Sequence, residues 1–156
     1  MHHRTPPLYA VTHITHYNKT TKSNLCRQAR RGSMDAETLA NAKQIRKAFE
    51  EVELRRLPKI RNVTLKGYCA RASYELYRWL QSADRVGDFV LGTYNGYSHC
   101  WVEIDHEIID LTATQFCIMD AVYVTSVSNP KYKKQCTNED ALLLVQSTWP
   151  EEQRVI

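Results

Sequence analysis

The sequence lacks the long apolar segments that mark membrane and secreted proteins. None of its 156 residues fall in a run of the roughly 18 apolar residues that a membrane-spanning helix needs. The N-terminus also lacks the apolar stretch of a secretory signal. We therefore expect a soluble, cytoplasmic protein without a membrane partner. Export as an effector without a classical signal stays open as an alternative.

The sequence lacks closely spaced pairs of cysteines. The five residues are Cys26, Cys69, Cys100, Cys117 and Cys136, an odd number with no Cys-x-x-Cys pair among them. Such a set argues against both a disulfide framework and a structural zinc site. We expect no metal and no organic cofactor, and one of these thiols is available for chemistry.

Acidic residues are missing from one end of the chain. Six of the 21 Lys and Arg residues lie within residues 1–33, which contain no Asp or Glu, so the rest holds 15 basic and 17 acidic residues. The basic pI therefore describes this end only, and we expect no specific nucleic-acid partner.

Residues 1–33 also show no helical or strand periodicity. We interpret them as a flexible basic leader before a single domain at residues 34–156. Three origins stay open: a native disordered arm, an organelle-targeting peptide, or a non-native stretch, because Gly32-Ser33-Met34 reads like a cloning junction.

Two amphipathic helices are predicted in the first half of the domain. Between Asp35 and Leu57, before Pro58, apolar residues recur at steps of three and four: Leu39, Ala42, Ile45, Phe49 and Val52. A second stripe starts near Gly67 and runs through Ser82: Cys69, Ala72, Leu76 and Leu80. Cys69 then lies in the first turn of the second helix.

After residue 87 the apolar period changes to two. Residues 88–94 and 97–104 flank Asn95-Gly96, the strongest short-range hairpin signal in the chain. Asp105-His106 joins the second strand to residues 107–113, and residues 121–127 supply a fourth strand. We predict an α+β domain with N-terminal helices packed on an antiparallel meander. Asn138 is expected to cap a last helix, although a strand is the alternative there.

The second hairpin places an imidazole and a carboxylate on one face. A two-residue turn sets Ile104 opposite Glu107, so Trp101 faces Asp110 and His99 shares its side of the sheet. His99 and Asp110 become diagonal neighbours with Cα atoms about 7–8 Å apart, within reach of a hydrogen bond.

A carboxylate that holds an imidazole supplies two members of a nucleophilic triad. Cys69 suits the third role, because free N–H groups and the helix dipole at a helix start stabilise a thiolate and an oxyanion. Cys100 fits less well, since it is next to His99 but points to the opposite face. Tyr68 and Gln115 are further candidates for donating a hydrogen bond to the oxyanion.

Three segments together resemble a known family. GYCARASYELYRWL, HCWVEI and IIDLTATQF are similar to the core of the transglutaminase-like branch of the papain-like cysteine enzymes, over roughly residues 62 to 127. The resemblance implies a papain-like or transglutaminase-like fold with Cys69 as nucleophile, His99 as general base and Asp110 as orienting acid. It also implies that Trp101 shapes the substrate cleft.

These patterns predict an enzyme that forms a thioester on Cys69 with a peptide, a protein or another amide or acyl substrate. Protease, amidase, deamidase and transglutaminase chemistry all stay open, because the chain lacks the large additional domains of cross-linking transglutaminases. The alternative is a catalytically inactive binding module of the same fold. A bacterial effector, a phage protein or a housekeeping amidase would each suit the resemblance.

Overall fold

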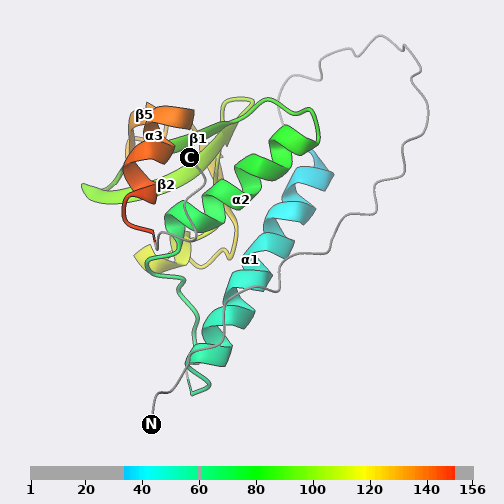
Figure 1. Cartoon of the computed structure of the whole chain (residues 1–156), viewed down its shortest axis with the longest axis vertical. Helices are drawn as coiled ribbons and strands as arrows, with labels where there is room; N and C mark the ends of the chain where they lie inside the picture. The colour runs from blue at the N-terminus through cyan, green and yellow to red at the C-terminus, as the bar shows by residue number, and fades with distance from the viewer. Residues whose placement is uncertain (1–33, 60, 150–156) are drawn as a thin grey trace, which may run out of the picture.

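The computed structural model describes residues 34–59 and 61–149 of the chain (Figure 1). The leader predicted for residues 1–33 lies outside the described residues. The described part is an α+β domain, as predicted. Its helices are α1 (Ala36–Arg56), α2 (Cys69–Ser82), the 3-10 helix η1 (Ala113–Phe116) and α3 (Asn138–Gln146). Its strands are β1 (Asp88–Tyr94), β2 (Tyr97–Ile104), β3 (Glu107–Asp110), β4 (Tyr123–Ser126) and β5 (Tyr132–Thr137).

Both N-terminal helices form where the apolar stripes predict them. The Asp35 carboxylate caps α1 by accepting the backbone N–H groups of Glu37 and Thr38 at 3.1 and 3.0 Å. The helix ends just before Pro58, which cannot donate a helical hydrogen bond. The predicted stripe of α2 is buried completely at Ala72, Leu76 and Leu80.

The two predicted hairpins are confirmed in turn and register. Asn95 and Gly96 both have positive φ angles, as do Asp105 and His106, which is the geometry of type I′ turns. Ile104 pairs with Glu107 as the two-residue turn requires. The positions of His99 and Asp110 on neighbouring strands therefore follow from the turn.

Two of the strands are shorter in the structure than the sequence predicted. β3 ends at Asp110 instead of continuing to residue 113, because the Asp110 carboxylate accepts the backbone N–H of Thr112 at 2.8 Å and turns the chain into η1. β4 covers only Tyr123–Ser126 of the predicted residues 121–127.

The sheet is not the simple meander that we predicted. Its strand order is β4-β3-β2-β1-β5, so the chain crosses from one edge to the other to place β5 beside β1. The sequence of β5, YKKQCT, has no apolar alternation and was not predicted as a strand. Gly92 permits the close pairing, because a Cβ atom there would lie 2.2 Å from the backbone oxygen of Lys133.

Helices cover one face of the sheet and aromatic side chains fill the other. Figure 1 shows α1 and α2 side by side, and α2 packs against β2 while α3 packs against β1 and β5. On the opposite face lies a cluster of Val90, Tyr94, Trp101, Ile108 and Tyr132, with Phe116 of η1 packed against it. No helix in the described ranges is long and apolar enough to cross a membrane.

The segment after β5 is helical, as predicted, but its cap differs. Thr137 is the N-cap residue of α3, and Asn138 is the first residue of the helix. The Asn138 amide instead accepts the N–H of Phe89 at 3.0 Å and donates to Asp88 at 2.7 Å. Asn138 therefore fastens α3 to the start of β1, a long-range contact that a local capping rule does not foresee.

Candidate active site

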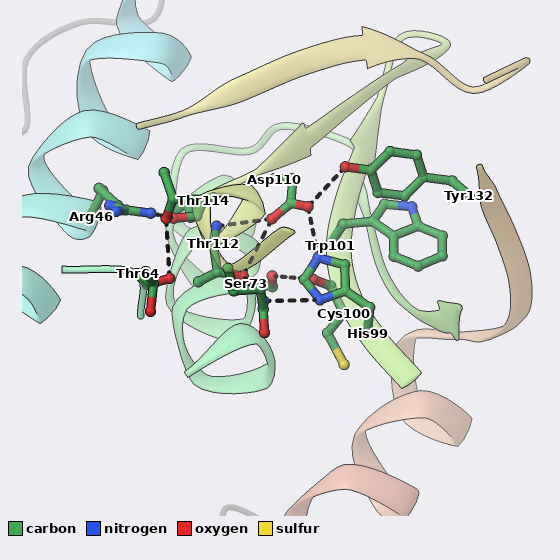
Figure 2. Close-up of polar contacts among 12 residues, drawn as sticks. Arg46, Thr64, Ser73, His99, Cys100, Trp101, Asp110, Thr112, Thr114 and Tyr132 are labelled. Atoms are coloured by element: carbon green, nitrogen blue, oxygen red, sulfur yellow. Dashed lines mark hydrogen bonds and ion pairs between the residues drawn. The ribbon is translucent and has the colours of Figure 1, made fainter. Parts of the chain in front are cut away.

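His99 and Asp110 form a buried pair at the centre of the sheet. The His99 Nε2 atom lies 2.7 Å from Asp110 Oδ2, and the two residues are 1% and 0% exposed (Figure 2). The diagonal contact predicted from the hairpin register is therefore present. Because Nε2 is used by the carboxylate, Nδ1 is the ring nitrogen left for other partners.

The Asp110 carboxylate is held by more than the imidazole. Tyr132 of β5 donates its hydroxyl to Oδ2 at 2.8 Å, and Thr112 donates its backbone N–H to Oδ1 at 2.8 Å (Figure 2). These donors offset the cost of burying the charge. Tyr132 was missed from the sequence because nothing in the apolar pattern placed β5 in the sheet.

Cys69 lies at the start of α2, as predicted. It lines a cavity of about 400 Å³ together with His99 and Cys100. The N-cap residue of α2, Tyr68, makes no side-chain capping hydrogen bond. The N–H groups of the first turn are thus not covered by a capping side chain and can receive an anion beside the Cys69 sulfur.

The thiol and the imidazole change each other's titration. Hydrogen bonds from Cys100 and His99 lower the pKa of Cys69 well below the value of an ordinary thiol, although burial opposes this. Burial alone would lower the pKa of His99, but hydrogen bonds to Asp110 and Cys69 raise it to about 9. A thiolate beside an imidazolium is therefore the favoured state near neutral pH.

Cys100 lines the same cavity as Cys69 and His99, although the strand alternation made it a poorer candidate in the sequence. Its side chain does point away from the His99 face, into the cluster that includes Ala141 and Val145 of α3. Cys69 packs against that same cluster, so the two thiols are neighbours. Hydrogen bonding to Cys69 and burial raise the pKa of Cys100, which stays protonated and serves as the donor.

Two of the three residues predicted for the substrate cleft or the oxyanion direct their polar atoms to other partners. The Tyr68 hydroxyl donates to Glu53 of α1 at 2.8 Å, so it is not directed toward an oxyanion beside Cys69. Trp101 is fully buried, packs on Tyr132 and donates to Glu103 at 3.1 Å. It lines a second cavity of about 610 Å³ that does not contain Cys69. Neither Tyr68 nor Trp101 lines the cavity that contains Cys69.

Gln115, the third of these predicted residues, lies close to His99. It lies on η1, and its Nε2 atom is 3.4 Å from His99 Nδ1 and 3.2 Å from the Thr112 hydroxyl. The Gln115 amide therefore stands on the side of the imidazole that Asp110 leaves free.

A buried arginine connects the segments that carry the site. Arg46 of α1 donates to the carbonyl of Leu111 at 2.6 Å, directly after Asp110, and to that of Val63 at 3.1 Å, in the loop before Cys69. Its charge is balanced by Glu50 at 2.6 Å. Arg46 thus holds the loop before Cys69 against the residue that follows Asp110 at the end of β3.

The described residues contain no cluster of three or more His, Cys, Asp or Glu side chains able to hold a metal ion. Comparison of the chain with protein-family models, with curated proteins and with solved structures finds no significant match.

Proposed function

We propose that the protein is a cysteine-dependent acyl hydrolase or acyltransferase that works through a thioester on Cys69. The observation that supports this most is the buried contact of 2.7 Å between His99 Nε2 and Asp110, because it leaves Nδ1 unused by the carboxylate while His99 lines the same cavity as Cys69. Peptides, proteins or other amides are the proposed substrates.

We also propose that the domain is a small variant of the transglutaminase-like, papain-like core. A cysteine at the start of a helix, a histidine on one strand and an aspartate on the next follow that core's order along the chain. The packing of α2 on β2 agrees with the proposal, since the Ser73 hydroxyl in the first half of α2 donates to the carbonyl of Cys100, next to His99, at 3.2 Å.

In the first step, the Cys69 thiolate attacks the acyl carbonyl and forms the new carbon–sulfur bond. The carbonyl oxygen becomes an oxyanion, which backbone N–H groups of the first turn of α2 stabilise together with the Gln115 amide. His99 Nδ1 then gives its proton to the leaving amine as the carbon–nitrogen bond breaks. The products of this step are a thioester, a free amine and neutral His99.

In the second step, neutral His99 takes a proton from water or from an acceptor amine, which attacks the thioester carbonyl. The carbon–sulfur bond breaks, and the Cys69 thiolate and the His99 imidazolium are restored. Asp110 keeps the imidazole ring in place and stabilises its positive charge in both steps.

A direct test is to treat the protein with an amino-acid p-nitrophenyl ester and to measure its intact mass during turnover. We expect one acyl group on Cys69, removed by hydroxylamine as thioesters are. Cys69→Ala should abolish the adduct, whereas Cys117→Ala, which removes an exposed thiol elsewhere, should retain it.

The amount of free acid and of transferred product in the presence of an added amine then separates hydrolysis from transfer. An unmodified Cys69 with every ester tried would contradict the proposal and favour the inactive binding module.

A further inference from the structure

We propose that the site selects an acyl donor with an apolar side chain next to the reacting carbonyl and a negative charge nearby. The inference rests on the proposed function of Cys69. Leu91, Leu144 and Trp149 would receive the apolar group, and Arg71 would bind the charge. All four residues line the cavity that contains Cys69 and His99.

The apolar wall is formed mainly by α3 and the residues after it. Leu144 is 60% exposed and lines the cavity, and Trp149 and the half-buried Leu91 continue that wall. A large aliphatic side chain exposed beside a nucleophile gains free energy when an apolar group covers it. Serine or glutamine side chains would gain much less at this wall.

Arg71 places a positive charge at the wall of the cavity. It lies in the first turn of α2, two residues after Cys69, where a cation is unfavourable because the helix start is already positive. Glu75, one turn further on, pairs with Arg78 at 3.9 Å, and no ion pair joins Arg71 to another described residue. Of the described residues that line the cavity, none is acidic. An anionic ligand would therefore compensate Arg71.

The size of the cavity agrees with such a ligand. Its volume of about 400 Å³ lies within the range of roughly 300–1,000 Å³ that is usual for small-ligand sites. Because Cys69 lines this cavity, we expect the group attached to an acylated Cys69 to lie inside it. The side chain nearest the reacting carbonyl is thus the one that meets Leu144 and Trp149.

The test uses four dipeptide p-nitrophenyl esters: acetyl-Glu-Leu, acetyl-Gln-Leu, acetyl-Glu-Ser and acetyl-Gln-Ser. The release of p-nitrophenolate gives kcat/KM for each, corrected for spontaneous hydrolysis and for the Cys69→Ala background. We expect a preference of at least about 10-fold for Leu over Ser, typical of an apolar pocket. A smaller preference, of about 3- to 10-fold, is expected for Glu over Gln, since the ion pair is partly exposed.

Matched variants assign each preference to its residue. Leu144→Ser should reduce the Leu preference, while Leu143→Ser, at a neighbouring residue that is 53% exposed and does not line the cavity, should leave it unchanged. Arg71→Gln should remove the Glu preference, while Arg78→Gln on the outer part of α2 should not.

Cys69-dependent turnover without either preference, or preferences that the Leu144 and Arg71 variants do not change, would overturn this inference and leave the proposed function intact. If no ester is turned over through Cys69, both fail together.

Discussion

The Asp110 carboxylate accepts hydrogen bonds from other partners besides the His99 imidazole. The His99 imidazole and the Tyr132 hydroxyl share Oδ2, and Oδ1 faces the backbone N–H of Thr112. Every partner can therefore donate to a carboxylate, whereas an amide would turn its own NH₂ group toward one of the donors.

We expect Asp110→Asn to keep the fold but to lower acyl turnover by roughly 10²- to 10⁴-fold. The amide NH₂ would favour the wrong imidazole tautomer and would leave the His99 imidazolium without a counter-charge. The turnover of an ester substrate and a urea unfolding curve measure the two effects separately. A folded variant with full turnover would show that the carboxylate is structural only.

Cys100 offers a second test at this scale, because hydrogen bonding with Cys100 is the largest cause of the lowered pKa of Cys69. We expect Cys100→Ala to move the pH midpoint of Cys69 alkylation upward toward the ordinary thiol value of about 8.5. Cys100→Ser keeps a donor and should keep the midpoint low. The rate of iodoacetamide labelling against pH measures both variants, and an unchanged midpoint in Cys100→Ala would remove Cys100 from the site.

At the level of the secondary-structure elements, the site depends on the close pairing of β1 with β2 on one side and with β5 on the other. Gly92 of β1 faces His99 on β2, and a Cβ atom at Gly92 would lie 2.5 Å from the Trp101 ring as well as against β5. The strand that supplies Tyr132 is thus positioned by the absence of a side chain at residue 92.

Gly92→Ala is therefore expected to destabilise the domain by more than about 1–3 kcal/mol, the usual cost of overpacking, because the overlap is with backbone. Gly96→Ala is the matched control. It meets nothing within 4 Å and carries only the strain of its positive φ angle, a cost of about 1–2 kcal/mol. Urea unfolding compares the two variants. Equal losses of stability would contradict the close approach of β1 and β5.

The elements that the sequence predicts best are those with local signals. The stripe of α2 and the Asn95-Gly96 turn define their own structure, and the register of the second hairpin brings Asp110 to His99. β5 has no such signal: its exposed Lys133 and Lys134 are typical of an edge strand and give no apolar alternation.

At the scale of the whole molecule, the parts of the site that escaped prediction depend on contacts between distant segments. Tyr132 reaches Asp110 only because β5 crosses to the far edge of the sheet. Cys100 and Cys69 are close to each other because of the way α2 packs on β2, and strand alternation does not specify that packing. The Tyr68 hydroxyl donates to Glu53 on α1, and the local sequence around Tyr68 gives no signal for a partner from another element.

The leader gives a prediction for the whole chain. Because residues 1–33 lack apolar periodicity, we expect their removal to change the thermal midpoint by no more than about 2 °C. Differential scanning calorimetry of the full chain and of residues 34–156 measures this. A large fall in the midpoint would mean that the leader contributes to the core.

The pH dependence of Cys69 alkylation shows whether Cys69 and His99 form a thiolate–imidazolium pair. We expect Cys69 to be the fastest thiol with iodoacetamide. Its rate should rise with a midpoint well below 8.5, the value of a free thiol, and change again near pH 9 as His99 loses its proton. Equal labelling of all the thiols in the folded protein, with a Cys69 midpoint at about 8.5, would show that Cys69 and His99 do not form this pair.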